Sequence, residues 1–186
     1  MIKIRAAKPA DANQIAAIYA PYVAASAVSF ETDPPNAQSM RGRMAKAADR
    51  YPWLVATSED ADVVLGYAYA NSFRDRPAYH WTVETSIYVA GDLQRQGVGR
   101  LLYSALIATL RAQDYVQAIA ALAMPNEHTI SLHESLGFRR AGMFREVGYK
   151  HGQWRDIGFW QLELTDSASP PPNPKPFSEV GVVGPY

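Results

Sequence analysis

Apolar residues recur along this chain with two periods, and the two periods predict alternating strands and helices. Alternating or continuous apolar runs predict strands over residues 3–6, 53–57, 63–71, 82–89, 117–122, 138–145 and 156–164. A spacing of three to four residues predicts helices that begin at Pro9 and Asn36 and that cover residues 98–112 and 126–136. The helix over 98–112 has the clearest apolar face, formed by Leu101, Leu102, Ala105, Leu106 and Leu110. Gly137 gives the last helix a stop signal.

The order of these elements predicts an α+β fold in one domain, with a mixed, mainly antiparallel, twisted sheet flanked by helices. We expect the domain to cover residues 1–166. Residues 167–186 hold 6 of the 13 prolines, which remove backbone donors and disfavour helix and central strand. We therefore expect an extended or disordered C-terminal tail. Two loops stand out, a polar one over 26–35 and an arginine-rich and aromatic one over 72–80.

Composition narrows the classes of function. The 186 residues carry 18 basic and 18 acidic side chains, which argues against a surface for nucleic acid or anionic lipid. The chain has no cysteine, so disulfides, thiolate metal sites and a cysteine acyl-enzyme are excluded. No apolar stretch has the length of a membrane span, and the first residues show no signal-peptide pattern. We expect a cytoplasmic protein.

The most informative stretch joins the strand 82–89 to the helix 98–112. Between them lies Gln94-Arg95-Gln96-Gly97-Val98-Gly99-Arg100. Free amides at a helix start favour an anion, and glycines allow its close approach. A pyrophosphate fits, with Arg95 and Arg100 as nearby cations. The segment lacks the Gly-Lys-Ser/Thr of a P-loop, and no acidic residue stands where a dinucleotide site requires one. The motif alone is also compatible with an ordinary glycine turn.

At these residues the chain resembles the GNAT superfamily of acetyl-CoA-dependent N-acetyltransferases. Gln94-x-x-Gly97-x-Gly99 is similar to the pyrophosphate loop of that family, and Asn126 to Phe138 is similar to its late Asn…Ser…Leu-Gly-Phe element. Within the family it resembles phosphinothricin and methionine sulfoximine N-acetyltransferases. Five segments carry this likeness, namely residues 28–32, 73–79, 82–84, 132–134 and 144–148. The Met124-Pro125 pair and the Pro-rich tail depart from the family pattern.

The resemblance implies a binding site for acetyl-CoA and no metal. It assigns the backbone of Ile87, Tyr88 and Val89 to the pantetheine and the acetyl carbonyl. The pyrophosphate would lie on the loop, whose residues are Gln94, Arg95, Gln96, Gly97, Val98, Gly99 and Arg100. Asn126 would touch the pantetheine arm. Tyr88 and Tyr103 are interpreted as aromatic walls rather than acids.

The reaction implied is aminolysis of a thioester, which needs a neutral amine and benefits from a base. The resemblance assigns this role to Glu84, which should face away from Val83 on its strand. The alternative is an exposed glutamate that pairs with a neighbouring strand. His133 is a candidate to protonate the leaving thiolate or to hold a relay water. The alternative for His133 is a histidine hydrogen-bonded to the helix backbone.

The acceptor site is expected to draw on both loops. Arginine forks suit carboxylate and phosphinate oxygens, and the candidates are Arg74, Arg76 and Tyr79. In the earlier loop the candidates are Phe30, which can pack on the substrate stem, Glu31, which can attract the ammonium, and Thr32. Solvated surface arginines are the alternative. The resemblance also implies a homodimer. Two competing hypotheses remain, namely an acetyltransferase for another amine or a peptide N-terminus, and a non-catalytic acyl-CoA-binding module.

Overall fold

The computed structural model describes residues 2–47, 49–58, 62–93, 96–166 and 168–184. Its strands form one seven-stranded sheet in the order β1-β2-β3-β4-β5-β7-β6. The strands are β1 Ile2–Ala6, β2 Trp53–Ser58, β3 Val64–Ser72, β4 Thr82–Val89, β5 Gln117–Ala123, β6 Arg139–Lys150 and β7 Gln153–Glu163. Only the β4–β5 pair is parallel, so the mixed and mainly antiparallel sheet of an α+β domain is confirmed.

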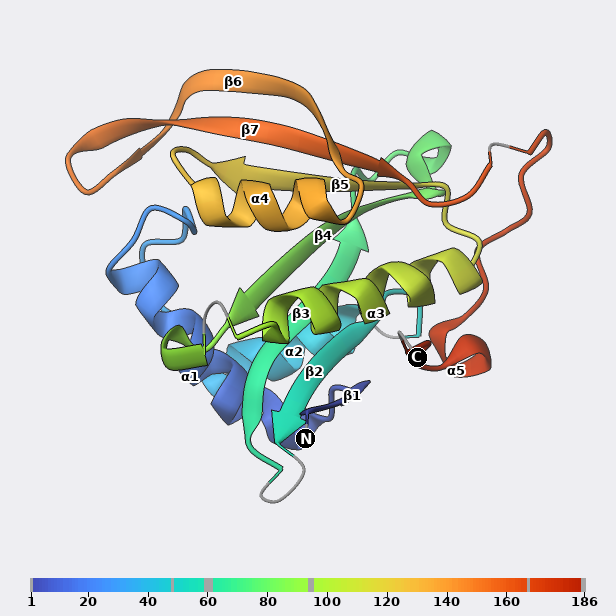
Figure 1. Ribbon diagram of the computed structural model, residues 1–186, viewed down its shortest axis with the longest axis horizontal. Helices are drawn as coiled ribbons and strands as arrows, with labels where there is room; N and C mark the ends of the chain where they lie inside the picture. Colours follow the sequence, from blue (N-terminus) through green and yellow to red (C-terminus); the bar gives the residue numbers. More distant parts are fainter. Residues whose placement is uncertain (1, 48, 59–61, 94–95, 167, 185–186) are drawn as a thin grey trace.

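Helices cover both faces of this sheet (Figure 1). The helices are α1 Ala12–Ala24, α2 Ala37–Ala47, α3 Val98–Ala112, α4 Glu127–Ser135 and α5 Phe177–Val180, with 3-10 turns at Pro9–Asp11, Pro77–Tyr79 and Gly91–Leu93. The apolar face of α3 is buried against Leu54, Ala68, Val83 and Trp160 in the larger core cluster, and α4 packs at its margin. Helices α1 and α2 bury a second cluster on the opposite face. No helix in the described ranges is long and apolar enough to cross a bilayer.

The hairpin of β6 and β7 is longer than the sequence predicted, and this part of the prediction was wrong. The strands extend through residues 146–150 and 153–155 to a turn in which His151 and Gly152 have φ of 51° and 73°. The added apolar side chains of Val147, Tyr149 and Trp154 are exposed. Because neither face of this ribbon is buried throughout, the alternation that signals a half-buried strand is missing.

The Pro-rich segment lies along the domain and contains the short helix α5. Phe177 packs against the main core, and its amide donates to the Asp49 carbonyl over 2.6 Å. The indole of Trp81 donates to the Pro172 carbonyl over 2.6 Å. The side-chain amide of Gln113 donates to the Lys175 carbonyl over 2.9 Å. These bonds join the tail to the segments that precede β2, β4 and β5.

Strands β4 and β5 separate part-way along their length. They pair only from Thr82–Gln117 to Glu84–Ile119, although β4 continues to Val89 and β5 to Ala123. Beyond that point β4 stays with β3, whereas β5 stays with β7. The sheet therefore opens into a V between two strands that are adjacent in space (Figure 1).

Candidate active site

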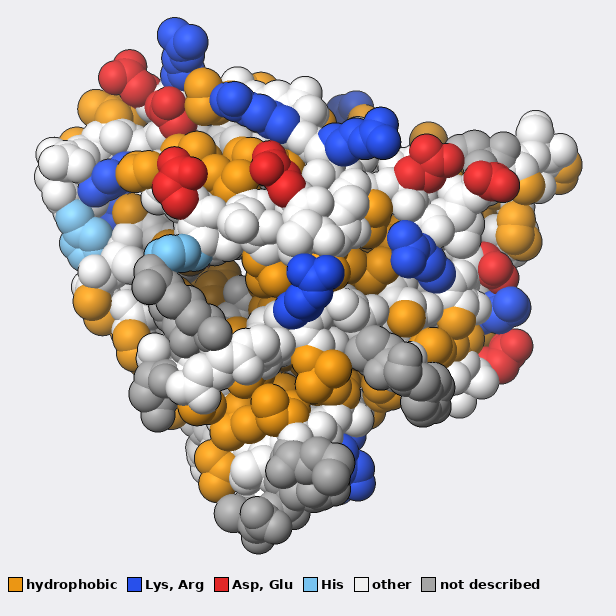
Figure 2. Space-filling model, in the orientation of Figure 1, with side chains coloured by type: hydrophobic (Ala, Val, Ile, Leu, Met, Phe, Trp, Pro, Cys, Tyr) orange, Lys and Arg blue, Asp and Glu red, His pale blue; other side chains and the backbone are white. Residues whose placement is uncertain are grey.

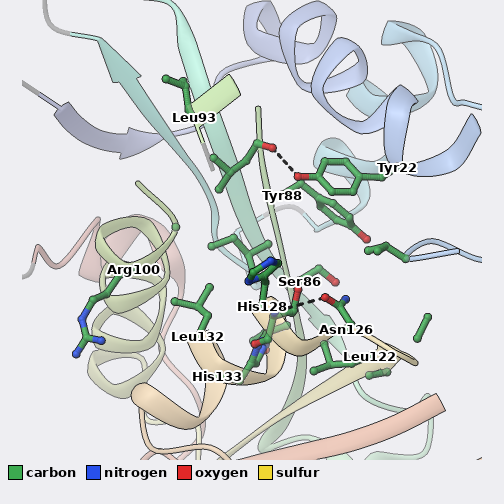
Figure 3. A pocket seen from close by; sticks show the side chains of 18 of the residues that line it. Tyr22, Ser86, Tyr88, Leu93, Arg100, Leu122, Asn126, His128, Leu132 and His133 are labelled. Carbon is green, nitrogen blue, oxygen red and sulfur yellow. Dashed lines mark hydrogen bonds between the residues drawn. The ribbon is translucent and has the colours of Figure 1, made fainter. Parts of the chain in front are cut away.

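A cavity of about 410 Å³ lies in this V. Figure 2 shows the surface hollowed between α4 and the start of α3. One wall is the separated part of β4, another is the end of β5, and α3 and α4 close the remainder (Figure 3). The lining residues are Tyr22, Val28, Thr85, Ser86, Ile87, Tyr88, Val89, Leu93, Gly97, Gly99, Arg100, Ala121, Leu122, Ala123, Asn126, His128, Thr129, Leu132 and His133.

The β4 wall offers main-chain groups to the cavity. The amide of Ala90 donates to the Leu65 carbonyl. In an antiparallel pair the hydrogen-bonded positions alternate. Given the β3–β4 register, the polar backbone groups of Ile87 and Val89 therefore point away from β3 and into the gap. The Val89 carbonyl accepts a 2.6 Å bond from the Tyr22 hydroxyl (Figure 3). This edge is suited to bind an extended ligand that carries amides.

The start of α3 closes one end of the cavity. Gly97, at its N-cap, has φ of 84°, a left-handed conformation that glycine adopts without strain. The next three amides precede that of Leu101, which is the first to donate within the helix, to the Gly97 carbonyl, so they have no acceptor inside α3 and can meet an anion. A Cβ added at Gly99 would make ordinary van der Waals contacts, 3.5 Å from Val89 and 3.6 Å from Leu132, so α3 lies close to both β4 and α4 here.

The other residues of the predicted loop differ in their positions. Arg100 is exposed at the cavity rim and donates to the Ser135 hydroxyl over 3.0 Å. Val98 is buried in the core rather than facing a ligand, and Gln96 is exposed. Gln94 and Arg95 lie outside the described residues.

Asn126 presents a donor to the cavity. It is the N-cap of α4, where its side-chain oxygen accepts from the Thr129 amide over 3.4 Å. This cap orients the amide group, and its Nδ2 is buried with no hydrogen-bond partner among the described residues. A buried donor left unpaired costs free energy, so this atom is suited to meet a ligand acceptor.

Glu84 stands at the apex of the V, where β4 and β5 part. Its side chain alternates with the fully buried Val83 and therefore lies on the α1–α2 face, as predicted. Ser86 follows on that face and lines the cavity, although Glu84 itself is not in its wall. Burial raises the pKa of the Glu84 carboxyl, and the nearby charge of Arg74 opposes this shift. The structure thus brings Arg74 and Glu84 into one electrostatic neighbourhood.

His133 lies in the cavity floor and is 1% exposed. Its Nδ1 is 2.7 Å from the Thr129 carbonyl, which can only accept, so Nδ1 carries the proton and Nε2 the lone pair. Its ring contacts the rings of Tyr103 and Phe138 edge-on, at centroid distances of 4.9 and 5.0 Å. Burial lowers the pKa of His133. A neutral imidazole suits the relay hypothesis better than the role of an acid.

A hydroxyl pair lies beside His133. The Tyr103 and Thr85 hydroxyls are 2.7 Å apart, and Thr85 also donates to the Ile119 carbonyl over 3.3 Å. Thr85 lines the cavity, whereas Tyr103 is fully buried. Burial raises the pKa of Tyr103, so its phenol stays protonated. Tyr88 is likewise neutral and packs edge-on against Tyr19 and Tyr22, which makes it a wall.

Glu31 is tied into a network on the α1–α2 face. Arg43 donates to both of its carboxylate oxygens over 2.7 Å, and the Tyr19 hydroxyl donates to one of them over 2.8 Å. The Arg43 bonds hold the pKa of Glu31 below its usual value. The negative charge is therefore already paired before any substrate binds. Thr32 is exposed and donates to Asp33 over 3.0 Å.

The arginine-rich loop lies at the surface before β4. Arg74 stacks on the Phe73 ring at 4.5 Å, and that ring meets Tyr79 edge-on at 5.5 Å. Arg76 is exposed and precedes the turn Pro77–Tyr79. Of the predicted acceptor residues here, Arg74 has the clearest link to Glu84.

Several residues of this site were not found from the sequence. They include Tyr19, Tyr22, Arg43, Thr85, Ser86, Leu93, Ala121, Leu122, Ala123, His128 and Thr129. Tyr19 and Tyr22 were identified only as members of an apolar helix face, and their hydroxyl bonds to Glu31 and Val89 have no local signal. Among the described residues, no group of three histidine, aspartate or glutamate side chains could hold a metal ion.

Comparison with known proteins identifies the family. The model of the acetyltransferase (GNAT) domain matches residues 4–158. The chain belongs to the GNAT acetyltransferase family. It is 41% identical to phosphinothricin N-acetyltransferase of Streptomyces viridochromogenes, over 92% of each chain. It is 40% identical to the L-methionine sulfoximine/L-methionine sulfone acetyltransferase of Pseudomonas paraeruginosa, over 90% of this chain and 98% of that one.

A solved GNAT structure agrees with the fold. The phosphinothricin acetyltransferase of Sinorhizobium meliloti was solved in complex with acetyl-CoA. It matches with a TM-score of 0.86 and 34% identity over 92% of both chains. The resemblance found in the sequence is thereby confirmed.

Proposed function

We propose that this protein transfers the acetyl group of acetyl-CoA to the amino group of a small amino-acid-like acceptor, such as methionine sulfoximine, methionine sulfone or phosphinothricin. The observation that carries the proposal is the opening between β4 and β5, with a half-buried carboxylate at its apex. The names and structures of the relatives supply the donor and the class of acceptor.

The donor would lie along the cavity. Its pantetheine amides can pair with the backbone edge at Ile87 and Val89, where the Val89 carbonyl already accepts from Tyr22, and Asn126 Nδ2 can donate to the same arm. Its pyrophosphate can accept from the amides at the start of α3, where the helix dipole favours negative charge. The glycines at 97 and 99 keep side chains out of that approach.

Glu84 would act as the general base in a direct transfer. An α-ammonium has a pKa of roughly 8, so it must lose a proton before its nitrogen can attack the thioester carbon. Glu84, raised in pKa by burial, would take that proton directly or through water. The new C–N bond then replaces the C–S bond, and coenzyme A leaves as a thiolate. The second proton that the attacking nitrogen loses would pass to this thiolate through a water that donates a hydrogen bond to His133 Nε2, on the opposite face.

Acceptor recognition would rest on cations near the apex. Arg74 lies within electrostatic reach of Glu84, and a guanidinium beside the base suits a substrate that presents a carboxylate next to its amine. Arg76, Tyr79 and Thr32 would form the outer rim, and Phe30 the apolar side. Since Arg43 already pairs with Glu31, we propose that Glu31 braces its loop and adds only a weak attraction for the ammonium.

We further propose that the protein works as a homodimer in the cytoplasm, where acetyl-CoA is available. The support for a dimer is the projecting hairpin. Phe144, Val147, Tyr149 and Trp154 are each more than half exposed there, an unusual density of apolar surface. A second copy of the chain would cover it. Sedimentation of the purified protein tests this, and a monomer at micromolar concentration would contradict it.

The release of coenzyme A thiol from acetyl-CoA tests the proposed activity. The acceptors would be methionine sulfoximine, methionine sulfone, phosphinothricin, the common amino acids and spermidine. We expect rapid turnover with the first three. Turnover only with another amine would keep the chemistry and replace the acceptor. Binding of acetyl-CoA without any turnover would favour a non-catalytic acyl-CoA-binding module.

A further inference from the structure

Lys150, at the end of β6, places a charged side chain in the interior. It is 7% exposed. Its ammonium donates to the Val23 carbonyl over 2.6 Å and to the Ser29 carbonyl over 2.7 Å. A buried ammonium is costly unless its donors are used. These two carbonyls use two of its three N–H donors. Burial lowers the pKa of Lys150, and the nearby carboxylate of Glu31 opposes this shift.

The bond to Val23 completes the end of α1. The last carbonyls of a helix have no partner within it. Here the Pro21 carbonyl accepts from the Ala25 amide, and the Tyr22 carbonyl accepts from the Ser26 hydroxyl over 2.7 Å. The Val23 carbonyl accepts from Lys150. A cation is favoured at this end of the helix dipole. Lys150 therefore fixes the point at which the chain leaves α1.

The bond to Ser29 fixes the loop that follows. The Ser29 hydroxyl is 2.7 Å from the Tyr19 hydroxyl and accepts from the Glu31 amide over 3.1 Å. Phe30 lies directly over Gly148, where any side chain would collide with its ring. The loop is thus pressed onto the β6–β7 hairpin, and Lys150 is the charged link between the two.

The same loop forms part of the catalytic cavity. Val28 lines it, and Phe30 is 37% exposed beside it. The helix that leads into the loop also contacts the donor strand, because Tyr22 bonds Val89 and packs on Tyr88. A shift of residues 24–31 would move Val28 at the cavity wall and the Phe30–Glu31 side of the proposed acceptor site, while the backbone edge of β4, which would bind the donor, stays held by β3.

We propose that Lys150 is a positioning residue, whose buried ammonium holds residues 23–31 as the wall of the acceptor site and so sets acceptor affinity without touching the acceptor. This inference rests on the proposed transfer to a small amine. It predicts that removing the Lys150 charge raises the KM for the acceptor more than the KM for acetyl-CoA. A general loss of folding would instead weaken both.

The test is Lys150→Met, which keeps an apolar stem and removes the charge. Lys3→Met, at an exposed site on β1, is the matched control. We expect the acceptor KM of Lys150→Met to rise about tenfold, the effect of losing roughly one well-made charged hydrogen bond. The KM for acetyl-CoA should change less than about twofold, as should both constants in the control. Equal changes in the two constants, or none, would overturn the proposal.

Hydrogen exchange gives a readout that does not depend on activity. Amides 24–31 should exchange faster in Lys150→Met than in the wild type, while those of α3 should not change. If the wild type acetylates none of the acceptors, the proposed function fails but exchange still decides the role of Lys150. Unchanged exchange in 24–31 would then refute it. If Lys150→Met does not fold, Lys150→Gln, which keeps a neutral donor, takes its place in both measurements.

Discussion

The proposed donor and acceptor sides of the opened sheet are built from different kinds of groups, main chain on one side and side chains on the other. On the proposed donor side the groups that would face the ligand are mostly main chain, namely the edge of β4 and the amides at the start of α3, with Asn126 as an added donor. On the proposed acceptor side the wall of the site is held in place by side chains, namely those of Glu31, Arg43, Tyr19 and Lys150. The first arrangement needs a strand, a turn and two glycines, whereas the second needs specific partners from four separate elements.

This difference separates the donor site, which can stay fixed, from the acceptor site, which can vary. A main-chain site tolerates changes in most side chains and is suited to a donor that never changes. A side-chain network can be altered one residue at a time and is suited to acceptors that differ between relatives. The substitutions below test this division, because each should affect one substrate more than the other.

The largest effect is expected for Glu84→Gln, at the point where the two sides meet. General-base catalysis typically contributes about 10²–10⁴ in rate, so kcat should fall by at least about a hundredfold. The KM for acetyl-CoA should stay nearly constant, because Glu84 lies outside the cavity wall. Steady-state kinetics with both substrates varied would measure this. An unchanged kcat would remove Glu84 as the base.

The next effect is expected for Arg74→Ala on the acceptor side. Loss of a charged hydrogen bond of about 1.5 kcal/mol would raise the acceptor KM about tenfold. Arg76→Ala is the matched comparison, since Arg76 has no described link to Glu84, and its effect should be smaller. Equal changes in the acceptor and acetyl-CoA constants for Arg74→Ala would contradict the recognition role.

A smaller effect is expected for Arg43→Met, which leaves Glu31 without its ion pair. We expect kcat/KM for the acceptor to fall about fivefold, the equivalent of roughly 1 kcal/mol. The double variant Glu31→Arg with Arg43→Glu should recover most of this, because a reversed pair can brace the loop in the same way. If kcat/KM of the double variant is as low as that of Arg43→Met, Glu31 acts directly on the ammonium of the substrate.

The same contrast explains what the sequence could and could not predict. Residues 98–112 and the turn at Gly97 have local patterns that are read within about 15 positions, and both were confirmed. The face of Glu84 followed from strand alternation. In contrast, the Lys150–Val23 bond joins residues 127 positions apart. Nothing near either residue indicates the other, since such a contact follows only from packing of the hairpin against α1.

On the donor side, Asn126→Ser should keep the helix cap while removing the buried donor Nδ2. One neutral hydrogen bond is worth about 1 kcal/mol, so the KM for acetyl-CoA should rise about three- to fivefold. The acceptor KM should stay the same. Isothermal titration with coenzyme A would separate binding from turnover. A change in the acceptor KM alone would show that Asn126 acts on the acceptor and not on acetyl-CoA.

The smallest effect concerns stability and again involves Glu84. Burial raises its pKa in the folded state above the unfolded value, so the folded protein binds the extra proton more strongly. The stability this adds is present below pH 4.5 and is lost as the pH rises through the folded-state pKa. Glutamine stays neutral throughout. Glu84→Gln should therefore raise Tm by on the order of 1–2 °C at pH 8 and by nothing at pH 4. Calorimetry at both values checks this, and a pH-independent difference would show that the carboxylate is not strained by burial. A gain in stability together with the loss of kcat would mean that the charge at the apex is kept for catalysis and not for the fold.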